Sequence, residues 1–266
     1  MAVMSLFDLA GRTALVTGAG SPTGIGFATA RLLGAMGATV WLTATTDRVH
    51  DRAAELRGEG LSVRALVADL TDPERTAETV HAAAHDNGLH IVVNNAGMTS
   101  IGTIAPTAEA GDLASMPLQS WHDGLARNLD TAFLVTRAAI PHMRHAHWGR
   151  IVMVASVTGP VMAMRSEPVY AAAKAGMVGL MRALAVDLAS SGITANAVAP
   201  GWIATGAQLP HEVREGEHTP VGRSGRPEEV AAAVAWFASP EASYCSGQLL
   251  VVDGAAGIAE ERALPG

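Results

Sequence analysis

The sequence alternates short apolar runs with longer helical patterns along nearly its whole length, and this alternation constrains the fold more than any other feature. β-Branched or aliphatic runs predict strands, whereas Ala- and Leu-rich stretches with apolar residues three and four positions apart predict helices. The expected strands are Thr13–Thr17, Thr39–Thr43, Val63–Ala68, Ile91–Val93, Ile151–Ala155, Thr194–Val198 and Leu249–Val252. The expected helices are Gly24–Met36, Asp47–Arg57, Pro73–Asp86, Leu118–His145, Val169–Ala189 and Pro227–Ala238.

Strands that are apolar throughout need cover on both faces, which crossover helices supply in a parallel sheet. We find no linker, low-complexity tract or internal repeat that divides the chain. The sequence therefore predicts an α/β fold, a single-domain (1–266) Rossmann-type doubly wound parallel sheet of about seven strands. Its ligand crevice is expected at the carboxyl ends of the strands.

Charge and cysteine content exclude several classes of function. Lys and Arg number 18 against 25 Asp and Glu, and the net charge of -7 disfavours nucleic acid and anionic membranes as partners. Cys245 is the single cysteine and the ten His show no metal-ligand spacing, so we expect neither an internal disulfide nor a metal site. We see no targeting segment and no apolar run near the roughly 20 residues that span a bilayer. A cytoplasmic protein without membrane attachment is expected.

A glycine-rich segment from Thr17 to Gly26 joins the first expected strand to the first expected helix. Glycines at this place let backbone N–H groups approach a diphosphate at the helix N-terminus. The Lys-Ser/Thr ending of an ATP-binding P-loop is absent, which favours a dinucleotide. An ordinary glycine turn has the same composition, so it is the position between strand and helix that favours a nucleotide site.

Tyr170 and Lys174 lie four positions apart on an expected helix, and Ser156 lies just past the end of the fifth expected strand. An ammonium beside a phenol favours the phenolate, so we expect the pKa of Tyr170 to lie below its usual value. A serine hydroxyl can hydrogen-bond a substrate carbonyl. The alternative is a packing pair whose amine extends to solvent.

Together with Asn94-Asn95-Ala96-Gly97 and Arg127-Asn128-Leu129, these motifs resemble the short-chain dehydrogenase/reductase family over nearly the whole chain. The resemblance implies that Ser156 holds a substrate carbonyl, Tyr170 transfers the proton, Lys174 binds ribose and Asn128 supports a water relay. It also implies that Pro200–Thr205 contacts the nicotinamide.

The cofactor is expected to be NADP(H), with NAD(H) possible. An acidic residue at the end of the second strand binds the ribose of NAD in this fold, but Ala44 occupies that position. Thr45, Thr46 and Arg48 supply donors and a cation that suit a 2′-phosphate; if NAD(H) were preferred, Asp47 would be the residue that faces the ribose. The expected cofactor contacts are Gly18, Ser21, Thr23, Gly24, Ile25, Gly26, Thr45, Thr46, Arg48, Asp69, Leu70, Asn95, Ala96, Gly97, Tyr170, Lys174, Pro200, Gly201, Ile203 and Thr205.

The resemblance implies reversible hydride transfer between the nicotinamide and a ketone or secondary alcohol. Within the family, the chain is most similar to the 3-oxoacyl-acyl-carrier-protein reductases and related ketoreductases. Two alternatives stay open: a catalytically silent dinucleotide-binding regulator, and an enoyl or imine reductase. Enoyl reductases of the family usually separate Tyr and Lys by six residues, whereas Tyr170 and Lys174 have three between them.

Two segments depart from the family pattern beside the expected substrate pocket, namely a long Met98–Pro117 and a short, polar Gly206–Thr219. We expect the second to belong to a substrate lid at about 204–220 that is mobile without ligand. The resemblance also implies a homotetramer. Second apolar faces on two helices are expected to form its contacts, and they include Phe133, Leu134, Met177, Leu180, Met181 and Leu184.

Overall fold

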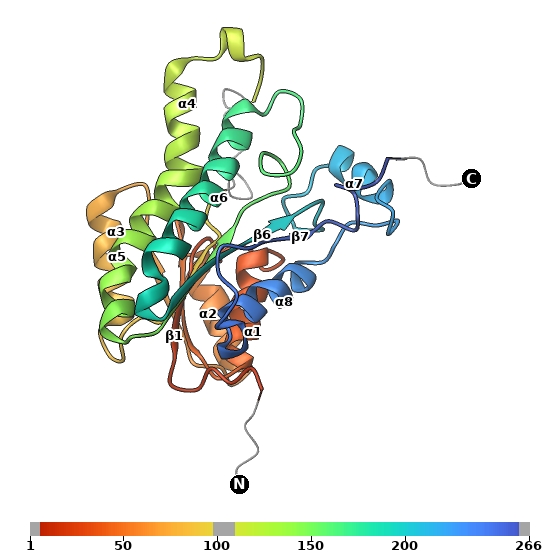
Figure 1. Cartoon of the computed structure of the whole chain (residues 1–266). Coiled ribbons are helices and arrows are strands. Elements are labelled where there is room, and N and C mark those ends of the chain that lie inside the picture. The colour runs from red at the N-terminus through yellow and green to blue at the C-terminus, as the bar shows by residue number, and fades with distance from the viewer. Residues whose placement is uncertain (1–5, 98–109, 261–266) are drawn as a thin grey trace.

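Seven parallel strands form one sheet in the order β3-β2-β1-β4-β5-β6-β7 (Figure 1). The computed structural model describes residues 6–97 and 110–260. Its strands are β1 Thr13–Val16, β2 Thr39–Ala44, β3 Val63–Val67, β4 Ile91–Asn94, β5 Gly149–Val154, β6 Ile193–Pro200 and β7 Leu249–Val252. Its helices are α1 Ile25–Ala35, α2 Arg48–Gly58, α3 Pro73–Ala84, α4 Leu118–Leu125, α5 Thr131–His145, α6 Pro168–Leu188, α7 Pro210–Glu217 and α8 Pro227–Ala238. The predicted Rossmann-type doubly wound parallel sheet is confirmed.

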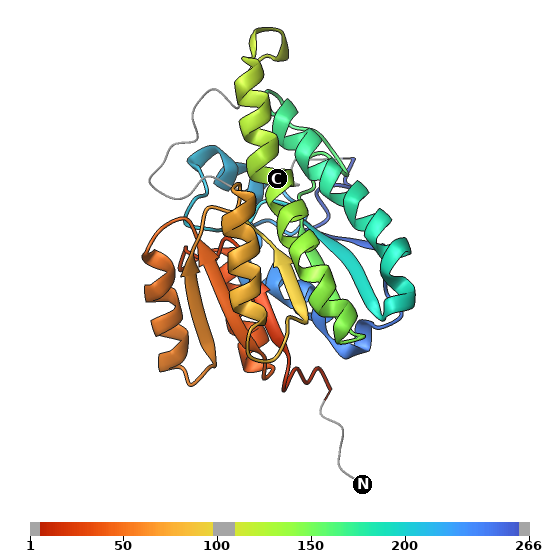
Figure 2. The ribbon, with the colours of Figure 1, turned by 90° about the vertical axis from the view of Figure 1, so that its left-hand side faces the viewer.

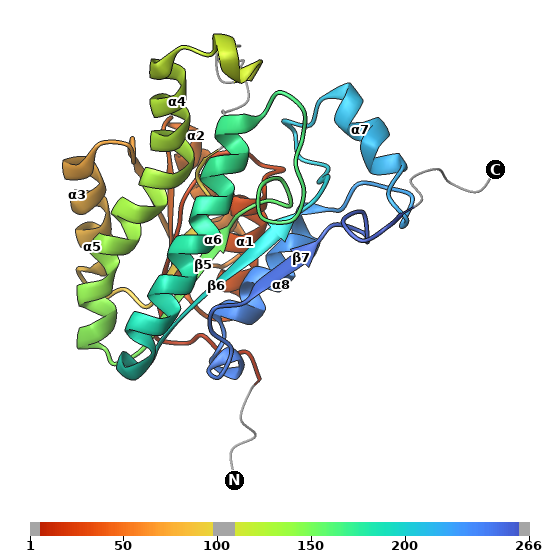
Figure 3. The same ribbon diagram turned by 45° about the horizontal axis from the view of Figure 1, so that its top comes forward.

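Helices cover both faces of the sheet, and Figure 2 views the face that α3, α5 and α6 cover, while Figure 3 also shows α1 and α8 on the other face. Side chains alternate between these layers because successive strand residues point to opposite faces. In β5, Val152 and Val154 join the core beneath α1, α2 and α8, whereas Ile151 and Met153 join the core beneath α3, α5 and α6. Strand β5 therefore contributes apolar side chains to the cores on both faces of the sheet.

The strand order places the ligand crevice between β1 and β4. The chain runs outward from β1 through β2 to β3 and then returns to pair β4 with the other side of β1. The loops that leave β1 and β4 at their carboxyl ends diverge to opposite faces of the sheet. The segments after β1, β4, β5 and β6 consequently lie around one crevice.

Two helical features differ from the expected pattern. The expected helix Leu118–His145 is α4 and α5 joined by a π-helical turn at Ala126–Asp130. Helix α7, Pro210–Glu217, lies inside the short, polar segment Gly206–Thr219, where no helix was among those expected. Of the long segment Met98–Pro117, residues 98–109 lie outside the described residues.

One helix is long and apolar enough to cross a membrane by length and composition alone, although Lys174, Arg182 and Asp187 interrupt its apolar residues. The helical stretch Pro168–Ser191 has 24 residues and contains an 18-residue window with a mean hydropathy of 1.4. In the structure this helix lies against β6, and Met177 and Met181 are fully buried in the core beneath it. A helix that covers a parallel sheet needs such an apolar face, so burial accounts for the side of the helix that faces β6.

Burial also shows that the second apolar faces, which were expected to form subunit contacts, are in part wrong. Leu134, Met177 and Met181 pack in the core, whereas Phe133 is 43% exposed. Leu180 and Leu184 are partly buried. The outer surfaces of α5 and α6 are therefore less apolar than the sequence pattern suggests.

Candidate active site

The glycine-rich loop lies against the end of β4 with no room for side chains at two of its glycines. Gly18 has φ of +69°, and a Cβ there would lie 2.9 Å from Ala96 Cα. A Cβ on Gly26 would lie 2.6 Å from Asn95 Nδ2. Gly24 is the N-cap of α1 and offers no capping side chain, so the first N–H groups of that helix are left for another acceptor. The loop thus presents bare backbone at a helix N-terminus, as a diphosphate site requires.

Thr17 and Asn95 hold this loop in place. Asn95 Nδ2 donates to the carbonyl oxygens of Thr17 at 2.9 Å and Gly18 at 3.1 Å. Thr17 Oγ1 accepts from the N–H groups of Asn95 and Ala96 at 3.0 and 2.9 Å. The Asn95 amide nitrogen is therefore engaged by the loop backbone, and its role is to shape the loop.

The end of β2 lies beside the same loop. A Cβ on Gly20 would lie 2.9 Å from the Ala44 Cβ, and no carboxylate stands at position 44. Beyond it, Arg48 Nε donates to Thr46 Oγ1 at 3.1 Å. The structure thus brings together the residues expected to select a 2′-phosphate.

Asp69 and Leu70 follow the end of β3. Asp69 Oδ1 accepts from the N–H and hydroxyl of Thr71 at 3.0 and 2.7 Å. The Leu70 side chain is buried in the core, and its carbonyl accepts from Thr76 Oγ1 at 3.0 Å. Of this pair, Asp69 has the polar side chain that can meet an adenine ring.

The four residues of the expected catalytic tetrad come from three elements. Ser156 follows β5, Asn128 lies in the π-helical turn, and Tyr170 and Lys174 lie on α6. Lys174 Nζ donates to Val154 O at 3.1 Å and lies 5.6 Å from the centroid of the Tyr170 ring. The segment after β5 and helix α6 therefore bring a hydroxyl, a phenol and an amine to the carboxyl end of β5.

Asn128 faces Gly97 and Lys174. A Cβ on Gly97 would lie 2.8 Å from Asn128 Oδ1 and 3.4 Å from Lys174 Nζ. Asn128 Nδ2 donates to Gly124 O at 3.2 Å, while its buried Oδ1 accepts no hydrogen bond from the described residues. Because π-helical turns open the backbone ladder and are frequent at functional sites, the irregularity fits the position of Asn128.

Burial moves both titratable groups toward their neutral forms. It lowers the pKa of Lys174 to about 8 and raises the pKa of Tyr170 above 10.0. The Ser156 hydroxyl partly lowers the Tyr170 pKa, and the carboxylates of Glu167 and Glu212 raise it. The expected lowering of the Tyr170 pKa by the Lys174 ammonium is therefore wrong, since burial raises this pKa more than the Ser156 hydrogen bond lowers it.

The segment after β6 continues the crevice. Pro200 ends the strand, and a Cβ on Gly201 would lie 2.7 Å from the Asp253 Cβ. Ile203 is buried in the core, so only its backbone is available to a ligand. The N–H of Thr205 donates to the carbonyl oxygen of Ile203 at 2.7 Å. The expected nicotinamide loop, Pro200–Thr205, thus lies between the core and the segment around Asp253.

Two features of the crevice were not expected from the sequence. The N–H of Gly206 donates to Thr23 Oγ1 at 2.8 Å, which joins the glycine-rich loop to the start of the expected lid. Helix α7 also carries Glu212 near enough to Tyr170 to raise the pKa of the phenol. Neither contact has a local signal, because each joins residues far apart in the chain.

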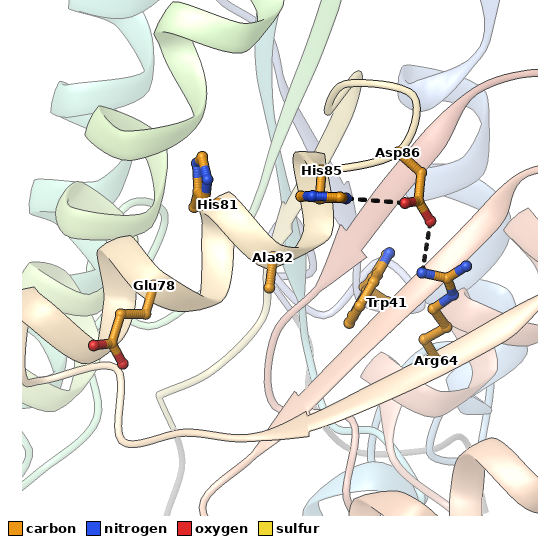
Figure 4. A pocket seen from close by; sticks show the side chains of 7 residues that line it. All are labelled: Trp41, Arg64, Glu78, His81, Ala82, His85 and Asp86. Carbon is orange, nitrogen blue, oxygen red and sulfur yellow. Dashed lines mark hydrogen bonds and ion pairs between the residues drawn. The ribbon is translucent and has the colours of Figure 1, made fainter.

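A hollow of about 470 Å³ lies elsewhere, against strands β2 and β3 and helix α3 (Figure 4). Its charged groups already have partners, since Arg64 lies 2.7 Å and His85 3.1 Å from carboxylate oxygens of Asp86, and Glu78 pairs with Arg75 at 2.9 Å. It contains none of the expected site residues. The crevice at the carboxyl ends of the strands is therefore the candidate active site.

Comparison with known proteins gives independent information on the family and activity to which this crevice belongs. A family model described as enoyl-(acyl carrier protein) reductase matches residues 18–256. The chain is 40% identical over 253 residues to the 3-oxoacyl-[acyl-carrier-protein] reductase FabG of Pseudomonas aeruginosa, covering 93% of this chain and 98% of that protein. It is 40% identical over 248 residues to the cis-4-hydroxycyclohexanecarboxylate dehydrogenase of Sinomonas cyclohexanicum, covering 91% and 95%.

A solved structure from Beutenbergia cavernae, described under the name of an NAD(P)-dependent gluconate 5-dehydrogenase, has NADP bound at low occupancy. It superposes with a TM-score of 0.86 at 36% identity, covering 96% of this chain and 100% of that one. A short-chain type dehydrogenase/reductase from Mycobacterium marinum superposes with the same TM-score of 0.86 at 31% identity, covering 97% and 100%. These similarities extend over the crevice and all the elements around it.

Proposed function

The chain belongs to the short-chain dehydrogenase/reductase family, and on this premise we propose that it reduces the ketone of a 3-oxoacyl thioester with NADPH, and oxidises the alcohol in reverse. At the coarser level it is an NAD(P)-dependent oxidoreductase that acts on CH–OH and C=O groups. The observation that carries the proposal is the meeting of Ser156, Tyr170 and Lys174 with the bare glycine-rich loop in one crevice.

The described residues fit a nicotinamide dinucleotide. Gly18 and Gly26 leave no space for a Cβ, so backbone alone lines the place where a diphosphate would meet the uncapped start of α1. At the other end, Ala44 has no carboxylate to repel a 2′-phosphate that Thr46 and Arg48 would hold. When bound, the cofactor supplies the hydride.

The protein's own groups position the substrate and transfer the proton. Ser156 donates a hydrogen bond to the carbonyl oxygen, and Tyr170 protonates that oxygen. The raised pKa of Tyr170 keeps its proton at neutral pH, which suits the donor of a reduction. Lys174 binds ribose hydroxyls, and the free Oδ1 of Asn128 accepts from a water that returns a proton to the site.

The remaining parts of the proposal concern the lid, the assembly and the location. We propose that residues 204–220, with α7 inside them, form the lid of a single domain that comprises residues 1–266. We propose a homotetramer, since apolar side chains remain exposed on α5 and α8, among them Phe133 at 43% and Trp236 at 39%. A cytoplasmic setting fits the one free thiol, Cys245.

A second candidate, an enoyl reductase, is favoured by the description of the matching family model. It requires protonation at carbon after hydride addition to a C=C bond. Enoyl reductases of the family usually separate Tyr and Lys by six residues, whereas three residues lie between Tyr170 and Lys174 on α6, which supports reduction of a ketone. We therefore rank reduction of the ketone first.

The absorbance of NADPH separates these candidates when the same protein is offered acetoacetyl-CoA, a trans-2-enoyl-CoA and a cyclic keto acid. The proposal predicts NADPH oxidation fastest with acetoacetyl-CoA. Faster turnover of the enoyl thioester would favour the second candidate, and faster turnover of the cyclic ketone would reject the thioester. Cofactor binding without turnover of any substrate would indicate a silent regulator.

A further inference from the structure

A second hollow, of about 480 Å³, lies at the opposite edge of the sheet from the candidate active site. It opens where β5 and β6 begin, and the turn between η4 (Pro240–Ala242) and β7 forms another wall. Ser156, in contrast, follows the far end of β5. The hollow therefore shares no residue with the expected cofactor or catalytic site.

A buried arginine forms one wall of this hollow. Arg150 is only 2% exposed. Its Nε donates to Ser239 O at 3.1 Å, and its Nη1 donates to Gly149 O at 2.9 Å, while Nη2 has no partner in the described part of the chain. The guanidinium as a whole is almost removed from water, but Nη2 is not among the buried polar atoms, so it is the donor that the hollow leaves open to an anion.

A second arginine, Arg12, adds another positive charge to this region. The guanidinium carbons of Arg12 and Arg150 lie 4.1 and 4.2 Å from the centroid of the Trp148 ring. In residues 6–97 and 110–260, neither arginine forms an ion pair with a carboxylate. Glu241, next to the wall residue Pro240, is engaged elsewhere, since its Oε1 accepts from Phe7 N at 2.9 Å. This region is thus locally cationic in a chain whose net charge is -7.

Hydroxyl groups complete the lining. Thr194 is the register partner of Arg150 across β5 and β6, so both side chains point to the same face of the sheet. Its Oγ1 is buried and has no hydrogen-bond partner among the described residues. Ser243 and Ser246 line the opposite wall. An unused hydroxyl beside an uncompensated guanidinium is the donor set that oxyanions take in proteins.

We propose that this hollow is a binding site for a phosphate-sized oxyanion, held by Arg150 and Thr194 at the amino-terminal edge of the sheet. The anion accepts from Arg150 Nη2 and Thr194 Oγ1 and compensates the charge of the two arginines around Trp148. The site is separate from the dinucleotide crevice and contributes to stability through β5 and β6, not to the hydride transfer.

Calorimetric titration of the full chain with inorganic phosphate tests the proposal. The titration is made with saturating NADPH, so that the phosphate positions of the dinucleotide crevice are filled, and sodium chloride at the same ionic strength is the reference. The wild-type protein is expected to bind about one phosphate. Thr194→Val keeps the size of the side chain but removes the hydroxyl, and the dissociation constant should rise about tenfold, with NADPH oxidation unchanged.

Arg64→Gln is the matched control, because the Arg64 guanidinium is already paired with Asp86 in the other hollow (Figure 4). It should bind phosphate as the wild type does. Arg150→Met should abolish binding, and if this variant does not fold, Thr194→Val still decides. Absence of phosphate binding in the wild type, or equal affinity in the wild type and Thr194→Val, would overturn the proposal.

Discussion

Tyr170 and Lys174 illustrate how burial sets the chemistry of single residues. The raised pKa of Tyr170 and the lowered pKa of Lys174 have the same first cause, which is burial: Lys174 is buried and Tyr170 is partly buried. The phenol is therefore protonated, and the amine is close to losing its charge near physiological pH. A cofactor whose ribose and phosphates favour the ammonium form would restore that charge.

This coupling predicts that affinity for NADPH depends on pH. The ammonium of Lys174 is the form that binds the dinucleotide, so binding takes up a proton once the pH exceeds its free pKa of about 8. The dissociation constant should then rise by up to about tenfold per pH unit. Calorimetry in buffers of different ionisation enthalpy measures both quantities. The Lys174→Met variant should bind more weakly and without this pH dependence, and an unchanged dependence would assign the proton to another group.

Cofactor preference is a second prediction at this scale. Ala44→Asp places a carboxylate where a 2′-phosphate is expected, and kcat/KM for NADPH should fall by about tenfold or more. The value for NADH should change little. Ala44→Asn is the control of the same shape without charge. Steady-state kinetics with both cofactors provide the measurement, and a preference for NADH in the unchanged protein would show that Asp47 faces the ribose.

The sequence predicts which residues meet in the crevice better than it predicts their electrostatics. Ser156 and Asn95 follow strands whose carboxyl ends lie at one edge, so their proximity follows from the order of the elements. The pKa of Tyr170 depends instead on its burial and on Glu212, which only the folded chain brings near. The spacing of residues along α6 predicts neither the burial of Tyr170 nor the proximity of Glu212.

At the scale of elements, strands and core helices are predictable because their apolar period is regular. Helix α8 and strand β7 have the expected bounds, Pro227–Ala238 and Leu249–Val252. The short helix α7 was not predicted because it is polar and has no regular apolar period. Glu212 stabilises the start of this helix, since its Oε2 accepts from Leu209 N at 2.7 Å. The π-helical turn at Ala126–Asp130 has no such local cause that we identify in the sequence.

The contact between Thr23 and Gly206 predicts that the glycine-rich loop restrains the lid. Thr23→Val removes the acceptor, and amide hydrogen exchange at Gly206 should become about fivefold faster, as expected for the loss of one exposed hydrogen bond. Thr23→Ser keeps the hydroxyl and should exchange like the wild type. Even in the wild type, residues 206–219 should exchange faster than the central strands. Equal rates in Thr23→Val and Thr23→Ser would show that the bond does not restrain the lid.

For the whole molecule, the expected assembly is a homotetramer. The burial of Met177 and Met181 removes them from any subunit contact, so the contacts must use side chains such as Phe133 and Trp236 that remain exposed. Light scattering at micromolar concentration should give four times the chain mass of 27.3 kDa. The Phe133→Glu variant should lower this mass, and a monomeric wild-type protein would contradict the assembly.

The central claim is that Tyr170 is the proton donor of an NADPH-dependent ketone reduction. The most direct measurement is turnover of acetoacetyl-CoA by Tyr170→Phe, together with the affinity of the same variant for NADPH. The phenol transfers the proton while the loop and Lys174 hold the cofactor, so kcat should fall by about 10² to 10⁴ and the dissociation constant should stay within about twofold. Retention of more than about a tenth of the wild-type kcat would contradict the account, because acid catalysis by the phenol would then contribute too little.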